Sequence, residues 1–191
     1  MKRLLGSTLA IAIGLCAGTV SASTFVAMTE NELISQSDLV IQGEVINMRS
    51  HWSQSGRIIA TDATVRVDEA LIGDSPRVIQ VRTIGGQVND FVVEAVGFPK
   101  LEMGEKVLLF LHQEPSDRSL RITGYQQGQF RIVTRLDGVT LAVPQVDEDA
   151  SLLRPDGTPV PTPRSVEIGA FKAHLLDAAE KVGRTDFGGT R

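Results

Sequence analysis

The sequence is poor in the residues that most often carry protein chemistry. Its 191 residues include one cysteine and three histidines, and aromatic residues make up 5% of the chain. The cysteine, Cys16, has no second cysteine with which to form an intramolecular disulfide. The fold must therefore be stabilised by a packed core. A chain of this length can bury roughly 70% of its unfolded surface and needs no covalent crosslink.

An excess of basic residues is also missing. The chain has 19 Lys and Arg residues against 23 Asp and Glu residues, a net charge of −4. Proteins that bind nucleic acid neutralise phosphates with Lys and Arg, so this balance argues against a nucleic-acid partner. A hydrophobic content of 42% and a charged content of 22% are typical of one globular domain.

The first 22 residues have the pattern of a secretory signal. Residues 1–3 are basic, residues 4–16 form an apolar run, and residues 20–22 are small where a signal peptidase cuts. A membrane anchor is the first alternative, but the run is shorter than the roughly 20 residues that span a bilayer. A lipoprotein is the second, but Leu15 is larger than the small residue expected before a lipid-bearing cysteine. We expect cleavage, no stable membrane anchor, and a periplasmic or secreted protein.

The rest of the chain predicts a mainly β fold. Apolar and polar residues alternate, which is the pattern of half-buried strands, and one unbroken apolar run is typical of a strand buried on both faces. Gly43 would let the first strand bend, as a small closed barrel requires. We expect an OB-like closed barrel of about five to seven antiparallel strands over residues 23–143, closing near residues 130–143. The predicted strands begin at Leu39 and cover residues 59–71, 78–83, 107–111, 120–125, 130–133 and 139–143.

Helices are predicted on both sides of this barrel. Thr29 and Glu32 form a capping box that opens a short helix over residues 29–36. Residues 144–163, which hold five prolines and an acidic run, predict an extended connection without regular structure. Ser165 can cap an amphipathic helix within 164–183, and residues 184–191 are expected to be a flexible tail. The apolar face of that helix comprises Ile168, Phe171, Leu175, Ala178 and Val182, and Gly183 would end it.

Several pieces of this pattern, taken in order, resemble a known family: residues 38–45, 65–73, 85–86, 97–99, 103–111 and 124–130. Together they are similar to bacterial secreted proteins of the netrin-like, tissue-inhibitor-of-metalloproteinase-like type, which have an OB-fold barrel. The resemblance implies an interaction module and no catalytic activity. Inhibitor members of the wider superfamily chelate the zinc of a target protease through an amino-terminal cysteine. This chain has Ser23 at its expected mature start and lacks that group.

No known catalytic or metal-binding motif appears. The chain lacks the Gly-x-Ser-x-Gly elbow, and its three histidines have no zinc-site spacing. The acidic run 147–149 lacks the calcium-loop pattern and is interpreted as a solvated charge cluster. We therefore expect no catalytic residue, metal or cofactor. A pair of dispersed glutamates, drawn from Glu44, Glu69, Glu94, Glu102 and Glu105, remains the basis for a carboxylate hydrolase as an alternative.

Two segments are candidates for binding a partner. Residues 50–57 are predicted to form the loop between the first two strands, and its His51, Trp52 and Arg57 offer the anchor chemistry common in protein contacts. The alternative is that Trp52 plugs one end of the barrel. Gly85 and Gly86 would let a partner backbone approach closely, or they form a turn that needs positive φ.

The hypothesis from the sequence is an exported, non-catalytic binding module. Its partner would be an extracytoplasmic protein, held by His51, Trp52, Arg57, Gly85 and Gly86. Three alternatives remain: a metalloprotease-inhibitor-like protein without the chelating cysteine, a carboxylate-based hydrolase, and a structural envelope protein.

Overall fold

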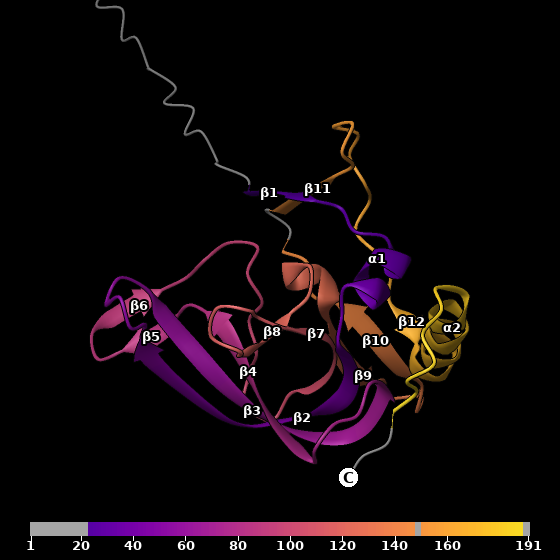
Figure 1. The fold of residues 1–191 in the computed structure, drawn as a ribbon, viewed down its shortest axis with the longest axis horizontal. Coiled ribbons are helices and arrows are strands. Elements are labelled where there is room, and N and C mark those ends of the chain that lie inside the picture. Colours follow the sequence, from indigo (N-terminus) through magenta and orange to yellow (C-terminus); the bar gives the residue numbers. More distant parts are fainter. Residues whose placement is uncertain (1–22, 148–149, 189–191) are drawn as a thin grey trace, which may run out of the picture.

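The fold is mainly β and consists of a closed five-stranded barrel with a short helix before it and a longer helix after it (Figure 1). The computed structural model describes residues 23–147 and 150–188. The predicted signal segment, residues 1–22, lies outside the described residues. The expected fold class is confirmed.

Five strands close the barrel in the order β2-β3-β4-β8-β7, and β7 pairs back to β2. Four of these pairings are antiparallel, but β4 and β8 run parallel and are joined at one residue pair, Val81 and Leu120. The expectation of antiparallel pairing throughout is wrong at this seam. Closure near residues 130–143 is also wrong, because the short β8 fits between β4 and β7 and completes the ring first. The barrel strands are β2 (Leu39–Trp52), β3 (Ile59–Ile72), β4 (Val78–Ile84), β7 (Lys106–Gln113) and β8 (Leu120–Ile122).

The long β2–β3 hairpin bends where the sequence predicted it. The pairing of the two strands shifts register between Gln42 and Gly43. A Cβ atom on Gly43 would lie 2.3 Å from the carbonyl oxygen of Arg66 on the neighbouring strand. Only glycine allows this close backbone approach, so Gly43 is required for the curvature that closes the sheet.

The apolar run of β7, residues 107–111, is buried and separates two hydrophobic cores, as the sequence predicted. Leu109 points into the barrel core, whereas Phe110 belongs to a second core that we call the helix-side core. The helix-side core lies between the outer surface of the barrel, the two helices and β9. Its most buried members include Ile34, Val40, Ile72, Leu108, Phe110 and Leu175.

Three more strands extend the sheet outward from β7. Strand β9 (Gln129–Thr134) pairs with β7, β10 (Thr140–Pro144) pairs with β9, and β12 (Val166–Glu167) pairs with β10. The predicted Asp-Gly hairpin between β9 and β10 is confirmed. A short 3-10 helix, η1 (Tyr125–Gly128), connects β8 to β9.

Both predicted helices are present. Helix α1 (Glu30–Ser35) has the complete capping box between Thr29 and Glu32. Helix α2 (Ile168–Lys181) buries Phe171, Leu175 and Ala178 as expected, but its cap is Glu167 and not Ser165. The reason is that Val166 and Glu167 pair with β10, so the chain is still extended two residues beyond Ser165.

The proline-rich connection contains one regular element that its composition did not predict. Strand β11 (Ala150–Leu153) pairs in parallel with β1 (Ser23–Val26). Figure 1 shows this two-stranded ribbon lying apart from the barrel, above α1, and we call residues 150–164 together with β1 the arm. A second small hairpin, β5 (Gly86–Val88) and β6 (Phe91–Val93), lies beside the far end of β2 and β3.

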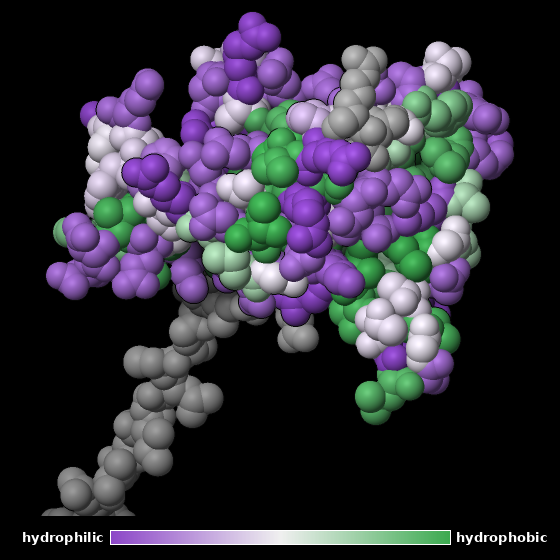
Figure 2. Space-filling model, turned by 90° about the horizontal axis from the view of Figure 1, so that it is seen from below, coloured by the Kyte–Doolittle hydropathy of each residue, from purple (hydrophilic) through white to green (hydrophobic). Residues whose placement is uncertain are grey.

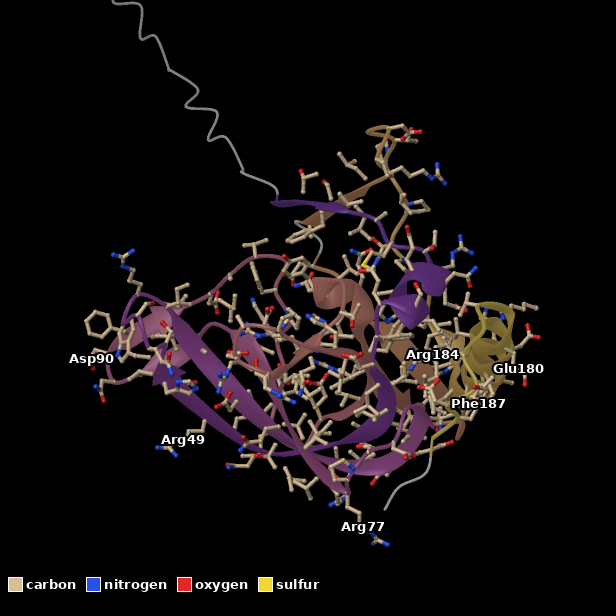
Figure 3. The ribbon with its side chains drawn as sticks, in the orientation of Figure 1. Arg49, Arg77, Asp90, Glu180, Arg184 and Phe187 are labelled. Carbon is tan, nitrogen blue, oxygen red and sulfur yellow. The ribbon has the colours of Figure 1, made fainter. Side chains whose placement is uncertain are left out.

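Within the predicted flexible tail, residues 184–191, the described part contacts the rest of the fold through Arg184 and Phe187. The Arg184 guanidinium donates to the carbonyl oxygens of Ile34 and Ser37, at 3.2 and 2.6 Å. Phe187 forms a β-bridge with Ile72. Figure 3 shows Arg184 and Phe187 beside α2. These long-range contacts tie the segment to α1 and β3, and no local sequence pattern could indicate them.

Candidate functional site

The predicted loop at residues 50–57 is shorter than expected. Strand β2 continues to its end at Trp52, where His51 pairs with Ala60 and Trp52 pairs with Ile59 of β3. The turn itself covers residues 53–58. His51 and Trp52 are therefore held by the regular pairing of β2 with β3.

Trp52 lies at an exposed apolar end of the molecule and does not plug the barrel. Its side chain is 39% exposed and its ring meets that of Phe91 edge to face, with ring centroids 5.6 Å apart. Phe91, Val92 and Ile58 are also exposed. Figure 3 marks this end by Asp90 in the β5–β6 turn, and Figure 2 shows apolar surface there among polar residues. We call these four side chains the apolar tip.

A groove of about 460 Å³ adjoins the apolar tip. One wall is the end of the β2–β3 hairpin, and the floor is β4 with the residues that follow β7. Because β3, β4, the β2–β3 turn and the loop after β7 all contribute residues, the groove lies across the outer surface of the barrel. It is lined by His51, Trp52, Ser53, Gln54, Ser55, Ile58, Ala60, Arg82, Ile84, Asp117 and Arg121.

Ion pairs fix the polar side of this groove. The Arg82 guanidinium donates to both carboxylate oxygens of Asp62, at 2.6 and 3.0 Å, and to Asp117 at 3.2 Å. Arg121 donates to the same Asp117 oxygen at 3.1 Å. The Nε2 atom of His51 lies 3.0 Å from Asp62. The network thus connects four strands and the loop between β7 and β8, and it holds the groove in one shape.

The same contacts set the ionisation of the two aspartates. Hydrogen bonds from Arg82 lower the pKa of Asp62, more than partial burial raises it. The pKa of Asp117 is lowered mainly by hydrogen bonds from the hydroxyl and backbone of Ser119. Both carboxylates therefore stay ionised at neutral pH, and neither is suited to act as a general acid.

The groove continues along the β4–β8 seam into a second hollow of about 370 Å³, since Arg82, Ile84 and Arg121 line both. Phe98 and Tyr125 lie at the other end of this hollow, with ring centroids 5.1 Å apart. The sequence did not identify Arg82, Arg121 or Tyr125 as site residues. Alternation places Arg82 on the outer face of β4, but only the parallel β4–β8 pairing brings it beside Arg121.

The other three predicted site residues lie outside the groove. Arg57 is exposed in the β2–β3 turn and does not line it. Gly85 and Gly86 have φ values of +104° and +124°; Gly85 lies between β4 and β5, and Gly86 is the first residue of β5. A Cβ on Gly86 would lie 2.3 Å from the Thr61 hydroxyl and 2.5 Å from the Ser50 hydroxyl. Both glycines therefore have the positive φ on which the turn interpretation rests.

The histidines and candidate glutamates are dispersed. His51 contacts Asp62, His112 contacts Thr123, and His174 contacts Glu30. Four of the five candidate glutamates lie beside a cation: Glu44 beside Arg66, Glu69 beside Lys172, and Glu102 and Glu105 beside Arg131. In the described part of the chain, no three metal-ligating side chains cluster to hold an ion. Of the expected acidic cluster, Asp147 accepts hydrogen bonds from Gly97 and Gln126.

Comparison with known proteins adds no relative. No protein-family model matches this chain, and no curated protein or solved structure is significantly similar to it. Within residues 23–147 and 150–188, no helix is long and apolar enough to cross a membrane. The function must therefore be argued from the geometry of the groove and of the surfaces around it.

Proposed function

We propose that this chain is an exported, non-catalytic binding module that holds an extracytoplasmic protein in the groove beside Trp52. The observation that carries the proposal is the exposed Trp52–Phe91 ring pair at the rim of a groove whose polar wall is fixed by ion pairs. Aromatic side chains that are rigid and half exposed are the usual anchors of protein interfaces. A preorganised groove reduces the entropy lost on binding.

The surroundings of Trp52 support a protein partner. Ile58, Phe91 and Val92 provide apolar contact area, while the serines and Gln54 of the β2–β3 turn provide hydrogen-bonding groups at its edge. An apolar centre with a polar rim is the usual composition of such interfaces. Arg82 and Arg121 are already paired with aspartates, so they give the groove shape and hydrogen-bonding capacity with little net charge.

The finer description of the barrel is part of the same proposal. We infer that it is an OB-type barrel related to the netrin-like family. The first strand, β2, pairs with the second and the fourth, and the third strand pairs in parallel with the fifth, which supports this assignment. In OB-type barrels the loop between the first two strands and the loop between the last two border the ligand site. Here those loops are residues 53–58 and 114–119, and both contribute to the groove. The amino-terminal pattern of residues 1–22 supports export.

Site-specific photocrosslinking tests the proposal. A photoreactive amino acid at Gln54 should give one dominant crosslinked protein in envelope or secreted fractions of the source cell. Trp52→Ala should reduce that crosslink by at least about tenfold, since an interface anchor commonly contributes more than a factor of ten in affinity. The thermal midpoint should change little because the Trp52 ring is partly exposed.

Leu136 provides the matched control. It is fully exposed at the tip of the β9–β10 hairpin, far from the groove in sequence and structure. Leu136→Ala should leave the Gln54 crosslink unchanged. Equal crosslinking by wild type and Trp52→Ala would exclude the groove as the binding site. Turnover of a substrate that a single Glu→Gln exchange abolishes would show that the module is an enzyme.

A further inference from the structure

A separate hollow, which is apolar inside, lies between the arm and the helix-side core. Its volume is about 450 Å³, within the 300–1,000 Å³ of pockets that take small molecules. Helix α1, helix α2, strands β7 and β9 and the arm each contribute to its wall. It is lined by Ala27, Met28, Glu30, Leu33, Phe110, Gln127, Phe130, Leu152, Val160, Pro163, Arg164, Val166, Ala170, Phe171 and His174.

The interior of this cavity is apolar. Leu33, Phe110 and Phe130 form its inner wall, and their side chains belong to the helix-side core. Leu152 and Val160 of the arm close it from the outside, joined by a hydrogen bond from the Val160 amide to the Leu152 carbonyl. An apolar guest filling this space would remove apolar surface on both sides from water, at about 25 cal/mol per Å².

Three charged or titratable groups lie among the lining residues. Glu30 and His174 are paired with each other, with the Glu30 Oε1 and His174 Nε2 atoms 3.0 Å apart. Arg164 is different, because its guanidinium has no hydrogen bond or ion pair with any of the residues that the structure describes. An unpaired arginine beside an apolar cavity offers a bidentate donor to a carboxylate.

We propose that this cavity binds a straight-chain alkyl carboxylate, with the hydrocarbon among Leu33, Phe110 and Phe130 and the carboxylate on Arg164. The positive charge of Arg164 decides which head group the ligand carries. A cationic amphiphile would meet unpaired Arg164, and a neutral one would leave the guanidinium without a partner. This inference is independent of the groove at Trp52 and adds a small-molecule site to the proposed protein-binding module.

Isothermal titration of the purified chain with three probes of equal chain length tests the proposal. Dodecanoate should bind with one-to-one stoichiometry, and about tenfold or more tightly than dodecylammonium or dodecanol, because a charge-assisted bidentate contact is available to it alone. Each probe is used below the concentration at which it forms micelles. Equal affinity for the three head groups would overturn the assignment of Arg164 as the carboxylate ligand.

Two variants separate the head-group contact from the cavity. Arg164→Gln should weaken dodecanoate about tenfold and leave dodecanol unchanged. Arg154→Gln is the matched control, because Arg154 is also an exposed arginine of the arm but does not line the cavity. Arg154→Gln should bind dodecanoate as wild type does. An equal loss of dodecanoate affinity in both variants would show that the arginines act only through general charge attraction and would overturn the proposal.

Filling the cavity is the second test. Ala170 lines it from an exposed position in the first turn of α2, so a larger side chain can be placed there without disturbing the buried face of the helix. Ala170→Trp should abolish binding of all three probes while the circular dichroism spectrum and the thermal midpoint stay close to those of wild type. Unchanged dodecanoate binding in this folded variant would place the ligand elsewhere and refute the inference.

Discussion

The groove beside Trp52 and the cavity beside Arg164 use arginine in opposite ways. The groove adjoins the end of the β2–β3 hairpin and the cavity lies among α1, α2 and the arm, elements that Figure 1 shows on different sides of the molecule. In the groove, Arg82 and Arg121 are paired with aspartates that the strands hold in place. At the cavity, Arg164 belongs to the arm and has no partner among the described residues. A paired arginine fixes a shape, whereas an unpaired one is available to a ligand. The two sites therefore differ in whether their arginines are already paired, and not in the type of residue that they contain.

The barrel core and the helix-side core also differ in the elements that surround them. Paired strands surround the barrel core on all sides, with one short pairing at the β4–β8 seam. The helix-side core is closed by helices and by the arm, and it opens into the cavity. We therefore expect substitutions to cost more in the first region than in the second.

The largest expected effect is on stability. Leu109→Ala in the barrel core should lower the free energy of unfolding by about 4 kcal/mol, because a sealed core cannot collapse around the missing atoms. Phe171→Ala should cost about 3 kcal/mol, at the low end for a phenylalanine, since its ring already borders the cavity. Urea unfolding measures both values. The exposed-site control Leu136→Ala should stay within about 0.5 kcal/mol of wild type. A larger loss in Phe171→Ala than in Leu109→Ala would contradict the comparison.

A second expected effect is on binding. Trp52→Ala should reduce the Gln54 crosslink at least about tenfold and leave dodecanoate affinity unchanged. Arg164→Gln should weaken dodecanoate binding about tenfold and leave the Gln54 crosslink unchanged. The reason is that the two sites share no lining residue. Loss of both activities in either variant would show that the sites are coupled, and the two proposals could then no longer be treated as independent.

A smaller effect is expected at the helix caps. Thr29→Ala removes the hydroxyl that accepts from the Glu32 amide and should cost about 1 kcal/mol. Because α1 forms part of the cavity wall, dodecanoate affinity should fall by a factor of about two to three. Ser165→Ala is the matched control, since the structure assigns the α2 cap to Glu167, and its stability should stay within about 0.5 kcal/mol of wild type. An equal loss in both variants would show that Ser165 does cap α2.

The smallest effect is on the pH dependence of stability, and its sign should differ between the two regions. The pKa of Asp62 is lowered by Arg82, so its contribution is complete above about pH 4 and is lost as the pH falls through the pKa of the folded state. The pKa of Glu30 is raised by burial, so ionising it costs stability as the pH rises above about 4.5.

Urea midpoints at pH 7 and pH 3 for two variants measure this difference. Asp62→Asn should be less stable than wild type at pH 7, with a smaller gap at pH 3. Glu30→Gln should be more stable than wild type at pH 7, with the advantage gone at pH 3. Gaps that do not change with pH in either variant would show that the two carboxylates do not titrate as their surroundings indicate.

Local patterns predicted the elements well. The capping box at Thr29, the Asp-Gly hairpin after β9, the doubly buried run of β7 and the apolar face of α2 all depend on residues close in sequence. The errors arose where a distant segment competes with a local signal. Ser165 has good cap chemistry, but pairing of Val166 with β10 delays the helix. Residues 150–153 have no strand pattern of their own and become β11 because β1 lies beside them.

The candidate site was predictable only in part. Trp52 is the single tryptophan of the chain and was identified by its type and by its position between two predicted strands. Arg57 was chosen with the same reasoning, but it is exposed and does not line the groove, although other residues of the same turn do. Arg82, Asp117 and Arg121 carried no signal, because each is an ordinary charged residue until the seam brings the three together.

The sequence by itself determined the class of this fold, the positions of most strands and both helices, and the glycine that allows the barrel to bend. These properties depend on residue periodicity and backbone sterics, which act over a few neighbours. Only the tertiary structure decided how the barrel closes, which arginines are paired, and that the arm covers an apolar cavity. Those properties depend on contacts between residues far apart in the chain, and no local pattern encodes which distant segment will lie alongside.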